Sequence, residues 1–251
     1  MSRAALQLDL NQNENEPIFR AIARAIERQI VAGVLRPGDR LPAEIDLAEG
    51  LGVNRSSVRE AIRLLEQNGL VAREPGRRML RVTIPSTIDL SKVISTAMVL
   101  RKVTFDNLWE AMAALEPAAA VAAAERRDDT VIRAMEENLK RTELALDDSS
   151  NLTALDVEFH DLVALGAKNG AIQLARQPLG QVFYPAFYSV MSRLNAGPRL
   201  LFAHRMIVDA IRDHDPVKAG EWMRKHIEDF KRGYHLANLD INQPIGPPGE
   251  S

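Results

Sequence analysis

The chain has 251 residues, a formal net charge of -2 and no cysteine. This length fits one large domain or two modest ones, and the absence of thiols excludes a disulfide framework, a thiolate zinc site and a cysteine nucleophile. Apolar residues make up 46% of the chain and aromatic residues 5%, and alanine-rich runs favour helices over a β-sandwich. The sequence contains no export signal and no membrane-spanning stretch, so we expect a mainly α-helical cytoplasmic protein.

The basic residues are concentrated in the first third of the chain. Residues 1–85 hold 13 Arg, no Lys and 11 acidic residues, whereas residues 86–251 hold 19 basic and 23 acidic residues. Guanidinium groups suit phosphates and guanine edges, so an all-arginine excess indicates a nucleic-acid partner. A solvated basic face would give the same composition.

Three helices are expected in this basic third. Apolar residues recur every four positions over residues 17–34, and a shorter helix is expected over residues 43–50. A third helix opens at Asn54 after a glycine turn, and Ser57 with Glu60 predicts a capping box at its start. The apolar stripe of this helix lies on one face, so Arg55, Arg59 and Arg63 are expected on the other.

Two short apolar runs follow the third helix and predict a β-hairpin. They cover residues 70–72 and 79–82, and an arginine-rich tip separates them. Three helices with a tight turn before the third, followed by a basic hairpin, are typical of a winged helix-turn-helix that binds DNA. The same elements also fit a small helical domain that binds protein.

The motifs within residues 35–44, 52–61 and 68–71 closely resemble the DNA-binding domain of the GntR family of bacterial regulators. The resemblance covers about residues 15–83 and implies DNA contacts in the third helix and at the wing tip, by Asn54, Arg55, Ser56, Ser57, Arg59, Gly76, Arg77 and Arg78. Two positions depart from the family pattern. Ile45 stands where the family usually has an arginine in the second helix, and Arg78 replaces a second wing glycine.

The rest of the chain predicts an all-α bundle of six or seven helices. Breaks are expected at Asp128, at residues 147–151, at Asn169, at residues 195–198 and at Asp215. The expected organisation is a flexible N-terminus over 1–14, the winged helix-turn-helix over 15–83, a linker and lead-in segment over 84–104, the effector and dimerisation bundle over 105–239 and a flexible tail over 240–251.

Three histidines and an aspartate stand on apolar faces of three expected helices. Asp156 and His160 are four residues apart and share a face, while His204 and His226 lie among apolar residues of two later helices. Each would need a buried partner, and convergence on one metal ion would satisfy all four. An ion pair on the helix surface, or a core histidine with ordinary hydrogen bonds, also fits the Asp156 and His160 spacing.

Residues 105–237 resemble the FCD effector domain of the FadR subgroup. The resemblance rests on motifs that begin at Leu115, Asp156, Asn169, His204 and Met223. It implies that Asp156, His160, His204 and His226 bind a divalent metal, with Zn, Ni, Mn and Fe all compatible. It further implies a homodimer that binds operator DNA and a small carboxylate effector.

Effector binding in this group commonly uses an arginine at the position of Met112. We therefore expect either that another cation holds the carboxylate, with Arg101, Arg176 and Arg205 as candidates, or that the effector is less acidic than usual. Two alternatives remain at this point. One is a metallohydrolase with Glu158 as base, although the helical period turns Glu158 away from the metal side. The other is an architectural DNA binder with a purely structural metal.

Overall fold

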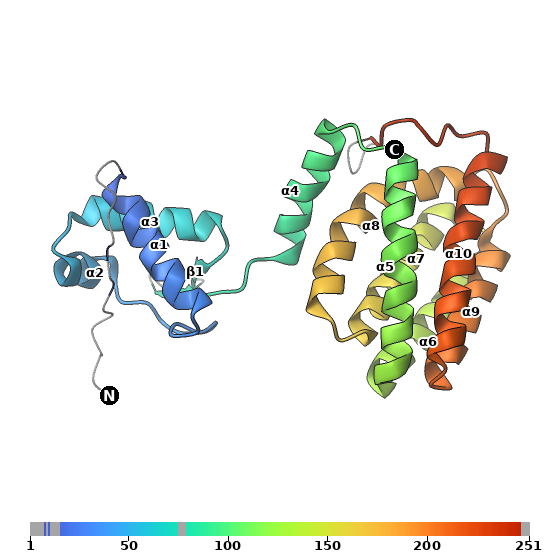
Figure 1. Ribbon diagram of the computed structural model, residues 1–251, viewed down its shortest axis with the longest axis horizontal. Helices are drawn as coiled ribbons and strands as arrows, with labels where there is room; N and C mark the ends of the chain where they lie inside the picture. The colour runs from blue at the N-terminus through green and yellow to red at the C-terminus, as the bar shows by residue number, and fades with distance from the viewer. Residues whose placement is uncertain (1–7, 9, 11–15, 75–78, 247–251) are drawn as a thin grey trace. The chain divides into compact units, whose positions relative to one another are not determined.

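The computed structural model describes residues 8, 10, 16–74 and 79–246, which form two compact units, Met1–Ser86 and Thr87–Ser251. The protein is mostly helical, as the composition predicts, and each unit has its own apolar core (Figure 1). None of the helices in the described part of the chain has the length and apolarity needed to cross a bilayer.

The first unit is a winged helix-turn-helix. Helices α1 (Ile18–Val31) and α2 (Glu44–Leu51) both pack on α3 (Arg55–Gln67). Strands β1 (Val71–Arg73) and β2 (Leu80–Val82) pair antiparallel, with Val71 opposite Val82. The turn from α2 to α3 depends on Gly52, whose φ of 65° is a left-handed conformation that glycine adopts without strain.

The expected capping box at Ser57 is wrong. Helix α3 begins at Arg55 with Asn54 as its N-cap, so Ser57 already lies inside the first turn. The backbone carbonyl of Asn54 accepts hydrogen bonds from the N–H groups of Ser57 and Val58, at 3.0 and 3.3 Å. The N-cap lies three residues earlier than a cap at Ser57 would require, two residues after the Gly52 turn, and this sets the start of the helix.

The second unit is a helical bundle made of α4 (Thr87–Leu100), α5 (Phe105–Arg126), α6 (Asp129–Leu144), α7 (Ser149–Gly166), α8 (Gly170–Met191), α9 (Gly197–Arg212) and α10 (Pro216–Leu236). Helix α5 packs against α7, α8, α9 and α10, and Figure 1 shows it between α8 and α10. The side chains of Asp128, Asp148, Asn169 and Asp215 accept backbone hydrogen bonds at the starts of α6, α7, α8 and α10. These caps explain why the predicted helix breaks lie where they do.

Two segments are more ordered than the sequence suggests. Residues 87–100, expected within a linker and lead-in segment, form α4, which buries Ser91 and Ser95 and packs on α8. Residues 240–246, expected in a flexible tail, return to the start of α5, where the N–H of Ile245 donates to the carbonyl of Val103 at 2.9 Å. The Ile245 side chain is buried, which accounts for this docking.

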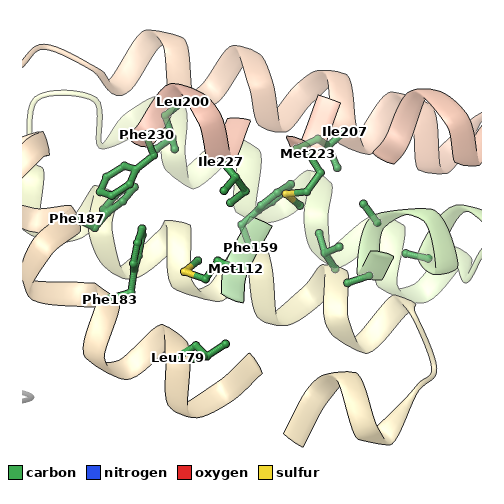
Figure 2. Packing of buried hydrophobic residues seen from close by; sticks show 14 of the residues in the cluster. Met112, Phe159, Leu179, Phe183, Phe187, Leu200, Ile207, Met223, Ile227 and Phe230 are labelled. Carbon is green, nitrogen blue, oxygen red and sulfur yellow. The ribbon is translucent and has the colours of Figure 1, made fainter. Parts of the chain in front are cut away.

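One end of the bundle core holds a group of aromatic side chains. The ring centroids of Phe183 and Phe187 lie 4.7 and 5.0 Å from that of Phe230. Figure 2 shows this aromatic group beside Met112, with Phe159 nearer to Met223. Buried polar side chains lie on α5 and α8 (Glu116 and Arg176) as well as on α7, α9 and α10 (Asp156, His160, His204 and His226).

Candidate metal centre and DNA-binding face

The exposed face of α3 carries the arginines expected to bind DNA. Arg55, Arg59 and Arg63 are all exposed, while Val58 and Ile62 are fully buried on the opposite side. The helix therefore presents a row of guanidinium groups that can reach a DNA groove. Asn54 and Ser56 are exposed beside Arg55 and Ser57 is half-buried, whereas Gly76, Arg77 and Arg78 lie outside the described residues.

Two arginines of the basic third stabilise the fold. Arg73 forms ion pairs with Glu44 at 2.8 Å and with Glu66 at 2.9 Å, which join the hairpin to α2 and α3. Arg81 pairs with Glu74 and donates to the carbonyl of Gly38 at 2.7 Å. The arginines are thus divided between the exposed face of α3 and ion pairs within the unit, a division that composition alone does not reveal.

The bundle brings together the four residues expected to bind a metal. Asp156 and His160 come from α7, His204 from α9 and His226 from α10, and one ligand atom of each lies within 4.8 Å of the others. Five of the separations between these atoms are 3.8 Å or less, including 3.8 Å between His226 Nε2 and Asp156 Oδ1. His226 Nε2 lies 3.2 Å from His160 Nε2 and 3.3 Å from His204 Nε2, and Asp156 Oδ1 lies 3.3 Å from His204 Nε2 and 3.8 Å from His160 Nε2.

These separations fit a single ion. Four ligands placed about 2.1 Å from a tetrahedral zinc would be about 3.4 Å from one another. Asp156 Oδ1 is fully enclosed and has no hydrogen-bond partner among the described residues. A buried carboxylate oxygen without a donor is costly, and a metal ion would satisfy it.

Burial and mutual repulsion set the charge state of the cluster. Burial, together with the neighbouring histidines, lowers the pKa of His204 and of His226 well below the usual value. Burial also raises the pKa of Asp156. Burial opposes protonation of His160, but the facing carboxylates of Glu116 and Asp156 outweigh it and raise the His160 pKa. Two of the three imidazoles are thus neutral, the form that binds metals.

Glu116 of α5 is a member of the site that the sequence analysis did not assign. It is fully buried, and one carboxylate oxygen accepts from Nδ1 of His160 at 2.8 Å while the other accepts from Nε of Arg176 at 2.9 Å. Burial alone would raise the Glu116 pKa, but His160 and Arg176 lower it to about 2. The Nδ1 contact leaves Nε2 of His160 facing the cluster, as in carboxylate–histidine–metal triads.

A sequence signal for Glu116 existed. The residue lies four positions after Met112 and four before Ala120, on a helix face that is otherwise apolar. An acidic residue on such a face requires a buried partner, although its spacing cannot say which one. The partners His160 and Arg176 are 44 and 60 residues away in the chain.

Comparison with known proteins agrees with the fold and the motifs. Residues 19–80 match the bacterial regulatory proteins of the gntR family, and residues 107–229 match the FCD domain. The uncharacterized HTH-type transcriptional regulator YcbG of Bacillus subtilis is 30% identical over 93% of this chain and 96% of its own length. The chain belongs to the GntR family.

Other relatives of this GntR protein support the same assignment. The Glc operon transcriptional activator of Escherichia coli K12 is 26% identical and covers 91% of this chain and 93% of its own length. The solved structure of a Streptococcus agalactiae GntR protein matches with a TM-score of 0.63 and 27% identity, over 85% of this chain and 99% of that one. This chain is therefore a DNA-binding transcriptional regulator with an FCD effector domain, not an enzyme.

The structure also explains why Glu158 is a poor catalytic base. Its side chain is 42% exposed and pairs with Arg141 on the surface of the bundle, away from the cluster. The position of Glu158 thus agrees with the regulatory role of the family.

The three arginines expected near an effector occupy different settings. Arg101 is exposed just after α4. Arg205 pairs with Glu143 at 2.8 Å and is 47% exposed. Arg176 is buried between Glu116 and Asp161, so its guanidinium is already held by two carboxylates. Of the three, Arg176 alone contacts a residue that touches the metal cluster.

Proposed function

We propose that this GntR-family regulator binds a divalent metal ion in its FCD domain and senses a small carboxylate metabolite that changes its affinity for operator DNA. The observation that carries the proposal is the inward-facing set of Asp156, His160, His204 and His226. Three imidazoles and one carboxylate suit Zn, Ni, Mn or Fe(II), and an ion with five or six ligands would keep one or two positions for another molecule.

The charge of such a site favours an anion. A divalent ion held by one carboxylate and three neutral imidazoles has a net charge of +1, and the buried ion pair of Glu116 and Arg176 beside it adds no net charge. The ion, when bound, would supply a fixed positive charge for the effector. The surrounding residues position the ligands and exclude bulk water from the cluster, in which all four residues are buried.

DNA recognition is proposed for α3 and the wing. Asn54, Arg55, Ser56, Ser57 and Arg59 would contact bases and phosphates, while Gly76, Arg77 and Arg78 would contact the backbone at the wing tip. The FCD domain supports a place in the FadR subgroup and a homodimer that reads two half-sites. A ligand that alters the spacing of the two DNA-binding domains of the dimer would weaken the contacts with both half-sites together.

Metal analysis followed by a ligand screen tests the binding of metal and of metabolite. We expect the purified protein to hold one divalent ion per chain, and a chelator to lower its melting temperature. Metal at a hundredfold excess over its Kd would contribute about 2.7 kcal/mol of stability. Carboxylates are then screened by thermal shift with and without the chelator. A protein that binds neither metal nor any carboxylate would contradict the proposal.

A purely structural metal is the second candidate, because the cluster joins α7, α9 and α10 in the interior of the bundle. Gel-shift titration separates the two functions. A carboxylate that changes the affinity for a DNA site selected from a random library supports sensing. A metal whose removal only unfolds the bundle, with no carboxylate effect on DNA binding, supports the structural function.

A further inference from the structure

Two neighbouring hollows on the α9 and α10 side of the bundle meet above the histidine cluster. One is a cavity of about 210 Å³ behind α8 and α10, and the other is a groove of about 460 Å³ between α9 and α10. Both are lined by Arg199, His226, Asp229 and Arg232. Of the four metal-binding candidates, His226 is the member that lines them, so this side gives solvent its approach to the cluster.

The mouth of the two hollows has an excess of positive charge. The Arg199 guanidinium pairs with Asp229, and Arg232 Nη2 lies 3.8 Å from the same carboxylate oxygen. Two guanidinium groups thus share one carboxylate. The side chains of Arg199 and Arg232 are 58% and 68% exposed, so a dissolved anion can reach them without unfolding any element.

His226 has an unused donor on this side. Among the described residues, its hydrogen bonds involve Nε2 alone, which faces His160 and His204. With Nε2 as the ligand atom, Nδ1 carries the proton and can donate. His160 satisfies the equivalent Nδ1 through the internal carboxylate of Glu116. His226 has no such carboxylate, although its side chain is more than nine-tenths buried.

The wall behind this mouth is apolar. Phe187, Val190, Met191, Leu200 and Phe230 line the cavity next to His226. A ligand that fits here has a single carboxylate at the arginine end and a hydrocarbon or aromatic body behind it. A second carboxylate at this wall would lie against these apolar side chains.

We propose that the α9–α10 mouth is a binding site for a small monocarboxylate with an apolar body, in which Arg199 exchanges Asp229 for the ligand and Nδ1–H of His226 donates to the ligand carboxylate. This inference rests on the proposed function for the effector class, and it places the carboxylate on Arg199 and His226 rather than on the open positions of the ion. The ligand would do for His226 what Glu116 does for His160. It would fix the ring with Nε2 toward the cluster, which couples ligand binding to metal affinity.

The helical spacing supports this exchange. Asp229 lies three residues after His226 on α10, so the two side chains share a face. A guanidinium–carboxylate pair is favourable in either arrangement, but the ligand adds burial of its apolar body. Asp229 therefore occupies the Arg199 guanidinium until the ligand carboxylate displaces it.

Calorimetric titration of the full-length, zinc-loaded protein with hexanoate and acetate tests the site. We expect hexanoate to bind more tightly than acetate, by about fourfold for each methylene that is buried. Arg199→Met should weaken hexanoate binding by about tenfold to a hundredfold. Asp229→Asn should strengthen it, because Arg199 loses its competing partner.

Matched control residues lie on α9, the helix that carries Arg199. Arg212 and Asp209 form an exposed ion pair near the end of α9, outside both hollows. Arg212→Met and Asp209→Asn should leave hexanoate affinity unchanged. Equal weakening by Arg199→Met and Asp229→Asn, or no effect of either, would overturn the proposed site. Zinc affinity is measured separately on the same samples, so loss of the metal function and loss of this site give different results.

Discussion

Replacing Glu116 with glutamine tests the link between the buried ion-pair network and the metal cluster. The glutamine side chain has nearly the same shape as glutamate, and its carbonyl oxygen can still accept a hydrogen bond from Nε of Arg176. Its amide nitrogen then faces Nδ1 of His160, where the carboxylate now accepts at 2.8 Å. Because an amide nitrogen donates, Nδ1 must become an acceptor and the His160 proton moves to Nε2, the atom that faces the cluster.

The expected size of the effect follows from two contacts. Loss of an outer carboxylate typically lowers metal affinity by about 10- to 100-fold. The folded-state pKa of Glu116 is lowered from 4.5 to about 2, which corresponds to about 3 kcal/mol of stability. Since the folded pKa is depressed, this contribution is present above pH 4.5 and is lost as the pH falls toward 2. Glu116→Gln should therefore be less stable at neutral pH and show a weaker acid dependence.

Competition titration against a chromogenic chelator measures the metal affinity, and chemical denaturation at several pH values measures the stability. Glu158→Gln is the matched control, because Glu158 of α7 forms an exposed ion pair with Arg141 of α6 that does not touch the cluster. Exposed pairs contribute about 0.2 to 1 kcal/mol, so the control should remain close to wild type in both measurements. Wild-type metal affinity in Glu116→Gln would refute the positioning role.

The remaining predictions concern DNA binding and the cluster. Arg55→Ala and Arg59→Ala should each weaken operator binding by about 1 to 3 kcal/mol in a gel shift at fixed salt, with unchanged melting temperature. Ile45 is half exposed at the start of α2. The variant Ile45→Arg should bind family-like half-sites more strongly, with a smaller gain on random DNA, and equal gains on both would indicate a phosphate contact. His226→Ala should lower the metal content and make the melting temperature insensitive to chelator. His235 is exposed, so His235→Ala should keep the wild-type metal content and the wild-type response to chelator. Full metal content in His226→Ala would remove that residue from the site.

Local signals in the sequence were sufficient for the helices and for part of the cluster. Asp128 and Asn169 were identifiable as helix starts because a short polar side chain beside an apolar run caps the backbone. The spacing of Asp156 and His160 places both on one face, and their burial follows from the apolar residues around them. These features depend on residues within one or two helical turns, and the spacing of apolar and polar residues in the sequence is enough to predict them.

Features that depend on distant residues could not be predicted in this way. Arg176 was expected to hold an effector, but Glu116 and Asp161 approach it from two other helices and occupy its guanidinium. The Arg199–Asp229 pair joins two helices above His226, and nothing in the spacing of α9 and α10 specifies that they meet there. Partner choice between helices is a property of their packing, which a single sequence does not display.

The hydrogen bond from Ile245 to Val103 brings together the two ends of the segment that holds α5 to α10. A domain whose ends are adjacent behaves as a cassette, because another chain can receive it without a change in the distance between the flanking segments. Helix α4 also packs on this segment, through α8, and residues 83–86 join it to the winged helix-turn-helix. A chimaera that exchanges effector domains among relatives would therefore place its junction within residues 83–86, so that α4 and the returning segment both travel with the bundle.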